Sequence, residues 1–482
     1  MRVRHFFLTL LALIAPALSA EDGGISTPPP PGEPRELKLP EPVERTLPNG
    51  LRVIVVERPG LPILSAHLVI RSGGEVDPRG GAGGMEMLAA LLKRGAGERS
   101  ATQIAQAIEA LGGTIETGAG WDQTAAKLTV MAGQAPAALE ILSDVVRRPT
   151  LGTAELERLR AETLDELRVR MEEPRTLAKA AAARVIFGDG PYGHMLGGTP
   201  KSVAGLRRKE LRELHGTYFR PDNAVLIFAG SLTAEQGFAW AKEFFGDWKK
   251  PAAPLPAVRV AEAPTEARVV IIDMPNAGQA AVVVGKMAVA RKAADYLPGV
   301  VASAVLGGGY SARLNAEIRV KRGLTYGASS DLGARRLGGS FIAVAQTKNS
   351  AGPEVATLMR AELDRLGAEP VPADELTPRT NTLTGEYGRS LETNDGFATR
   401  LAGWAVLDVP MGMLNTYPAE VRAVTPDSVQ KFAREHLQSA DTCVVIAGNA
   451  ESFRATLGAS FKKAWIIPQK SLDLDSLSLR GK

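Results

Sequence analysis

Residues 306–326 read LGGGYSARLNAEIRVKRGLTY, a glycine run followed by an amphipathic segment and the start of a strand. Apolar residues recur at helical spacing between Ala312 and Lys321, which predicts a helix with one buried face. Gly323 predicts a left-handed end to that helix, and Tyr326 then begins a strand. The three glycines predict a turn between two helices. They are not a phosphate-binding loop, because no Gly-Lys-Ser/Thr follows them and no strand precedes them.

The order of elements around this stretch occurs twice along the chain. The first copy is predicted at Leu51–Val56 with Leu64–Ile70 as a hairpin, Met85–Leu92, Ala101–Leu111, Thr114–Gly118, Ala125–Met131, Pro136–Val146, Ala154–Arg170, Ala224–Ala229 and Ala234–Phe245. The second copy is predicted at Ala267–Ile272, Ala280–Val284, Leu297–Leu306, Ala312–Lys321, Ala328–Asp331, Gly339–Ala345, Glu354–Leu366, Ala373–Ser390 and Thr442–Ala447, with a final helix behind it. The repetition predicts an α+β fold of two similar sandwich-like halves, each a sheet covered by helices. Two such halves facing each other would form a clam around a chamber.

Composition shifts set the predicted boundaries of these halves. The first half is expected at residues 45–250 and the second at 266–466, with a linker rich in proline and alanine at 251–265 and a tail at 467–482. The chain is 45% hydrophobic and 23% charged, which allows two to three sizeable cores.

The N-terminus carries the features of a secretion signal. Arg2 and Arg4 precede an apolar run at Phe6–Leu18, and small residues follow it, so residues 1–20 are predicted to be a cleaved signal peptide. Residues 21–44 are rich in proline and predict a flexible leader. Neither the signal nor any later run approaches a comfortable membrane span of about 20 apolar residues, so we expect no membrane span and a periplasmic location.

Charge and cysteine content exclude two further classes of protein. The net charge is +4 and the charges are interspersed, which argues against nucleic acid as a partner. The single cysteine, Cys443, lies in an apolar strand and is predicted to be a buried, inert thiol. The fold therefore needs no disulfide.

Several motifs, in this order, resemble the pitrilysin or insulinase family of zinc peptidases (peptidase family M16). They are Gly83 before the helix at Met85–Leu92, Pro191-Tyr192-Gly193 with Gly198-Thr199, the Tyr218–Asn223 turn leading into Val225–Gly230, and above all residues 306–326. The resemblance covers roughly residues 45–465. It implies a fold of two homologous halves.

The family's inverted zinc motif, His-x-x-Glu-His, is missing. Two histidines one helical turn apart hold Zn²⁺ in such a motif, and the glutamate between them acts as general base. When Gly95 is aligned with the family's glycine after the helix, Glu86, Ala89 and Ala90 occupy the three positions. An alanine can serve neither as base nor as ligand.

The family's third ligand, a glutamate on a later helix, is matched by Glu166, whereas Leu159 replaces an accessory glutamate. Glu86 and Glu166 make a poor zinc site without histidine, and the plainer interpretation is two solvated helix charges. The histidines, which have no ligand spacing and are predicted to be surface or packing residues, are His5, His67, His194, His215 and His436. We therefore expect no cofactor in this chain.

The second half of the family's active site is retained. The resemblance implies that Arg319 and Tyr326, seven residues apart, grip the substrate backbone and steady the developing oxyanion. A guanidinium and a phenol supply the hydrogen-bond donors that this chemistry needs. Outside the family context, Arg319 would be an ordinary cation at a helix end and Tyr326 an ordinary strand aromatic.

The resemblance implies a non-catalytic subunit of a heterodimeric zinc peptidase. Its partner would be a homologous subunit that carries the zinc, its substrate a peptide, and the chain alone would be inactive. The alternative is a peptide-binding or scaffold protein with no proteolytic partner. Hydrolysis by unrelated residues of this chain is the weakest hypothesis, because the sequence has no nucleophile elbow.

Overall fold

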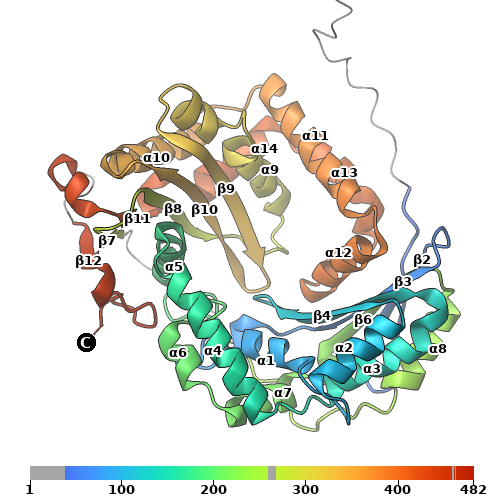
Figure 1. Ribbon diagram of the computed structural model, residues 1–482. Coiled ribbons are helices and arrows are strands. Elements are labelled where there is room, and N and C mark those ends of the chain that lie inside the picture. The colour runs from blue at the N-terminus through green and yellow to red at the C-terminus, as the bar shows by residue number, and fades with distance from the viewer. Residues whose placement is uncertain (1–37, 259–267, 459–460, 462, 482) are drawn as a thin grey trace, which may run out of the picture. The chain divides into compact units, whose positions relative to one another are not determined.

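The computed structural model describes residues 38–258, 268–458, 461 and 463–481. The predicted signal peptide, most of the leader and the second part of the predicted linker lie outside these residues. From Leu39 onward the described chain forms one compact unit built around two six-stranded sheets (Figure 1).

The first sheet has the strand order β1-β2-β6-β3-β5-β4. Its strands are β1 (Val43–Thr46), β2 (Arg52–Glu57), β3 (Ile63–Ile70), β4 (Thr114–Ala119), β5 (Thr124–Met131) and β6 (Ala224–Gly230). The second sheet has the order β12-β7-β11-β8-β10-β9. Its strands are β7 (Val269–Asp273), β8 (Ala280–Ala288), β9 (Thr325–Arg335), β10 (Gly338–Thr347), β11 (Cys443–Gly448) and β12 (Trp465–Pro468). Five strands of one sheet match five of the other in order and direction, which confirms the predicted repeat.

Helices surround both sheets. In the first half they are α1 (Gly84–Leu92), α2 (Ala101–Ala110), α3 (Ala135–Arg147), α4 (Thr153–Arg170), α5 (Pro174–Phe187), α6 (Pro200–Gly205), α7 (Arg208–Tyr218) and α8 (Ala234–Phe245). In the second half they are α9 (Tyr296–Gly307), a π-helix (Asn315–Val320), α10 (Gly352–Ala368), α11 (Ala373–Ser390), α12 (Asn394–Val406), α13 (Met413–Arg422) and α14 (Pro426–His436). Among the described residues, no helix combines the length and apolarity needed to span a bilayer.

Two sequence predictions about how the strands are connected were wrong. The predicted hairpin does not form, because β6 lies between β2 and β3, parallel to β2 and antiparallel to β3. Nor, among the described residues after β11, is there an α-helix. Short 3₁₀ turns at Ala450–Ser452 and Arg454–Thr456 lead instead towards β12, which extends the sheet beside β7. In both places long-range strand pairing overrides the local sequence pattern.

Each half covers one face of its own sheet, and a helix from the other half covers the opposite face. In β2, Val53 and Val55 join the core beneath the first half's own helices, whereas Ile54 and Val56 pack in a cluster that includes α12. This follows from the alternation of side chains along a strand. In return, α5 packs against β7, β8 and β11 of the second sheet. Cys443 is buried in this second cluster, and burial raises the pKa of its thiol to about 12, as expected of an inert thiol.

The tip of the β9–β10 hairpin inserts into the first half. The Arg335 guanidinium carbon lies 4.5 Å from the centre of the Trp121 ring, 4.6 Å from that of Tyr192 and 5.4 Å from that of Phe187. The burial that accompanies this contact lowers the pKa of Arg335 to about 10. A guanidinium enclosed by aromatic rings away from water is attracted by their negatively polarised faces. We call the three rings the aromatic cage.

Polar contacts complete this junction. The Arg336 guanidinium pairs with the buried Glu75 and donates to the carbonyl of Arg71 at 2.8 Å. Tyr192 donates to Asp122 at 2.5 Å. Burial raises the pKa of Glu75 to about 8, although the positive charge of Arg336 opposes this rise. The hairpin thus joins the halves through cation–π contacts and hydrogen bonds together.

Arg335→Ala should destabilise the protein by about 2 kcal/mol, because it empties a desolvated aromatic cage. Urea unfolding, followed by tryptophan fluorescence, measures the change. Arg168→Ala is the matched control: its guanidinium is exposed and pairs only with Asp165, so the free energy of unfolding should change by less than about 0.5 kcal/mol. Equal effects of the two substitutions would show that the cage does not hold the halves together.

Glu75→Gln should change how stability depends on pH. The pKa of Glu75 is higher in the folded state than in the unfolded state. The protonated carboxyl group therefore contributes fully to the free energy of unfolding below the unfolded-state pKa near 4.5, and this contribution is lost as pH rises through about 8. Glutamine mimics the protonated acid, so the wild type should lose stability relative to Glu75→Gln between about pH 5 and pH 9. Unfolding curves at several pH values test this. Parallel pH profiles of the two proteins would contradict it.

Candidate functional site

Helix α1 carries the three positions of the lost zinc motif. It begins after Gly83, which has a φ of +87° and lies so close to the Gly197 backbone that a Cβ atom would approach it to 2.9 Å. Glu86 is in the first turn and exposed, Ala89 is fully buried and Ala90 is half-buried. Neither alanine offers a ligand atom.

The structure brings Glu86 and Glu166 into electrostatic contact from α1 and α4. Desolvation of its carboxyl group raises the pKa of Glu86; the charge of Arg170 lowers it, and the charges of Asp77 and Glu166 raise it. Glu166 is exposed. The two carboxylates therefore lie in one region, where the carboxylate of Asp77 also acts on Glu86.

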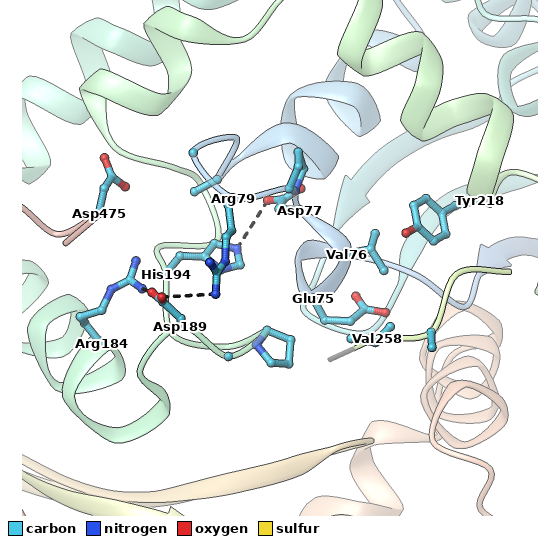
Figure 2. Close-up of a pocket in the computed structure, with 16 residues that line it drawn as sticks. Glu75, Val76, Asp77, Arg79, Arg184, Asp189, His194, Tyr218, Val258 and Asp475 are labelled. Atoms are coloured by element: carbon cyan, nitrogen blue, oxygen red, sulfur yellow. Dashed lines mark hydrogen bonds and ion pairs between the residues drawn. The ribbon is translucent and has the colours of Figure 1, made fainter. Parts of the chain in front are cut away.

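A pocket of about 410 Å³ lies beside the start of α1 (Figure 2). On its wall, the buried Asp77 accepts hydrogen bonds of 2.8 Å from the backbone N–H groups of Gly83 and Met85, and His194 lies 3.5 Å from it. Burial is the main reason that the pKa of Asp77 is raised, and these hydrogen bonds oppose the rise. The carboxylate thus caps α1 and orients it, a role that no local sequence pattern indicated.

Among the described residues, no histidine joins Glu86 and Glu166 in a group of three metal ligands, although His194 lies beside Asp77 at the start of α1. His67 is buried against Asp395, His215 meets the carbonyl of Val146, and His194 is beside Asp77. His436 pairs with Asp295 at 2.6 Å, and Glu435 completes a partly exposed group whose ligand atoms lie within 4.8 Å of one another. This group, in the second half, is the only such set of three among the described residues.

Arg319 lies on the π-helix. The sequence predicted an ordinary helix here, but Lys321 N–H donates to the carbonyl of Ala316, five residues back, at 3.0 Å. The wider turn ends at Gly323, which has the predicted left-handed conformation with a φ of +64°. In the first half, the helix at the same place in the element order, α2, is a regular α-helix. Single π-turns of this kind are frequent at functional sites.

Tyr326 lies in a second irregularity, a β-bulge near the start of β9. The register pairs Ala328 with Ala345 but Thr325 with Thr347, so Tyr326 and Gly327 together face Gln346. A bulge breaks the alternation of side chains and can re-aim one of them. Tyr326 is accordingly 85% exposed.

Both of these side chains keep uncommitted donors. Among the described residues, neither the Arg319 guanidinium nor the Tyr326 hydroxyl makes a hydrogen bond or ion pair, whereas the nearby Arg313 and Arg322 are paired with glutamates. Arg319 instead lies over the exposed ring of Tyr310, with its guanidinium carbon 4.8 Å from the ring centre. Tyr310 lies within residues 306–326, and no local sequence pattern indicated a role for it.

Comparisons with known proteins agree with this architecture. Residues 52–199 match the family model described as insulinase (peptidase family M16), and residues 205–379 match that of the peptidase M16 inactive domain. The crystal structure of a peptidase M16 inactive domain from Pseudomonas fluorescens has the same fold, with a TM-score of 0.79 and 24% identity over 84% of this chain and 97% of that one.

Two relatives of similar sequence carry different descriptions, one as a zinc protease and one as a non-peptidase homolog. An uncharacterized zinc protease of Streptomyces coelicolor is 26% identical over 81% of this chain and 86% of its own. The non-peptidase homolog YmxG of Helicobacter pylori is 22% identical over 82% of this chain and 91% of its own. The two matched family models and the repeated six-stranded sheet together define the fold as that of an M16 peptidase. The chain belongs to peptidase family M16.

The purified chain should contain no stoichiometric zinc, because Ala89 and Ala90 remove a base and a ligand. The double substitution Glu86→His with Ala90→His should restore binding if Glu166 stands where the third ligand belongs. Metal analysis after dialysis measures both proteins. One zinc per wild-type chain would refute the loss of the site, and a zinc-free double variant would show that the alignment on α1 is wrong.

Proposed function

We propose that this chain is the non-zinc-binding subunit of a heterodimeric M16 peptidase located in the periplasm. It would supply Arg319 and Tyr326 to peptide hydrolysis at the zinc of a homologous partner subunit. The observation that carries the proposal is the pair of uncommitted donors: both side chains stand on irregular backbone and neither is used within the described chain.

The chemistry of these donors fits peptide hydrolysis. A planar guanidinium and a phenol can donate to a substrate carbonyl, and more strongly to the oxyanion that forms when the carbonyl is attacked. Neither supplies a nucleophile or a metal ligand. Catalysis would therefore require the zinc and general base of the partner.

An unpartnered strand edge gives a peptide a place to bind. β4 is the outermost strand of the first sheet and α1 packs against it, so the edge lies beside the lost zinc motif. An extended peptide can add to such an edge through main-chain hydrogen bonds. This edge supports a peptide as the ligand under both the subunit hypothesis and the alternative.

A peptide-binding or scaffold protein without a proteolytic partner is the second candidate. The loss of the zinc motif and the resemblance to a relative named as a non-peptidase homolog favour it. The scaffold hypothesis gives no chemical reason for an arginine and a tyrosine whose hydrogen-bond donors are left free.

Co-expression with a zinc-bearing homologue, followed by size-exclusion chromatography, should yield a heterodimer that cleaves peptides. In it, Arg319→Ala and Tyr326→Phe should each lower kcat about a hundredfold or more, because each removes a donor aimed at the oxyanion. Thermal melts should stay unchanged, since both side chains contribute little to the core.

Arg322→Ala is the matched control, because Arg322 lies near Arg319 but pairs with Glu317. It should leave kcat and KM as in the wild type. A higher KM with unchanged kcat in the Arg319 and Tyr326 variants would mean that the pair only binds substrate. Separate elution of the two chains, with full activity in the homologue alone, would favour the scaffold function.

A further inference from the structure

Asn315, the first residue of the π-helix, joins three segments of the second half. Its side-chain amide nitrogen donates to the carbonyl of Gly309 and to that of Ala328, each at 2.9 Å. Its amide oxygen accepts from the N–H of Ala328, also at 2.9 Å. Asn315 is 7% exposed, so these bonds are shielded from water.

The bonded positions flank the proposed functional side chains. Gly309 directly precedes Tyr310, Ala328 follows Tyr326 by two residues, and Asn315 itself precedes Arg319 by four. One amide therefore fixes the glycine turn, the π-helix and the bulged strand against one another. Of the side chains of this size, only asparagine has two donors and an acceptor in this arrangement; aspartate has the acceptors alone.

Tyr310 acts on Arg319 from the turn that Asn315 holds. The ring is 64% exposed and contributes little to the core, yet the guanidinium of Arg319 lies over it. Contact with the ring face leaves the N–H groups at the edge of the guanidinium free to donate. The ring thus restricts the side chain of Arg319 without using its donors.

We propose that Asn315 and Tyr310 are positioning residues for Arg319 and Tyr326. Asn315 sets the three backbone segments, and Tyr310 supports the guanidinium. This inference rests on the proposed function of Arg319 and Tyr326. It adds that their geometry is fixed before substrate arrives, which spares the ordering of two flexible groups during the reaction.

The test uses Asn315→Asp, which keeps the shape of the side chain and removes both donors, with Asn381→Asp on an exposed part of α11 as matched control. In the isolated chain, hydrogen exchange should quicken at residues 309–311 and 325–328 in the Asn315 variant only. In the reconstituted heterodimer, kcat per folded complex should fall about tenfold or more. A residue with only a structural role would lower stability and leave that kcat unchanged.

A second pair of variants keeps the inference testable if Asn315→Asp fails to fold. Tyr310→Phe retains the ring and should keep the wild-type kcat/KM, whereas Tyr310→Leu should lose about two- to fivefold, as expected for an exposed cation–π contact. Equal kcat/KM values for the two variants would overturn the role of Tyr310. Unchanged exchange and kcat in Asn315→Asp would overturn that of Asn315.

The variants at Arg319 and Tyr326 separate this inference from the proposed function. If Arg319→Ala and Tyr326→Phe lower kcat while the Asn315 and Tyr310 variants do not, the proposed function stands and the positioning fails. If Arg319→Ala and Tyr326→Phe leave turnover unchanged, the proposed function fails and the positioning inference falls with it.

Discussion

The architecture depends on the exchange of one helix between the two halves. α12 covers the face of the first sheet that its own helices leave open, and α5 does the same for the second sheet. Apolar burial on both faces explains why the central strands β6 and β11 are buried along their whole length. The β9–β10 hairpin adds Arg335 and its aromatic cage to the same junction. The halves are therefore two copies of one pattern, and each supplies a helix that covers the sheet of the other.

Conformational irregularity is concentrated where the proposed chemistry lies. The second half has a π-helix at Arg319 and a bulge at Tyr326, whereas the equivalent helix of the first half, α2, is a regular α-helix. Residues held in less common backbone conformations persist when their surroundings determine them strongly. The three side-chain hydrogen bonds of Asn315 hold the π-helix and the bulge in these conformations. The first half contributes buried capping at Asp77 instead, which stabilises a helix whose metal ligands are missing.

The sequence predicted the elements better than their pairing. Helical periodicity located α1, α3 and α10, and the repeat predicted two similar sheets, because both signals are local. The pairing of β2 with β6 could not be read from adjacent residues, since the two strands are far apart in the chain. The family resemblance singled out Arg319 and Tyr326. The resemblance could not reveal that Tyr310 and Asn315 support these two side chains. Those contacts depend on a π-turn and a bulge, and no local sequence pattern predicts either.

The helix exchange also bears on how the polypeptide matures. During synthesis, the strands of the first sheet, from β2 to β6, leave the ribosome long before α12 does. Until α12 arrives, Ile54, Val56 and Ile227 lack the main part of the apolar cluster that covers them in the folded structure. An apolar sheet face of this kind is prone to associate with other exposed apolar segments during that interval. The final packing of the first sheet therefore includes a helix from the C-terminal part of the chain.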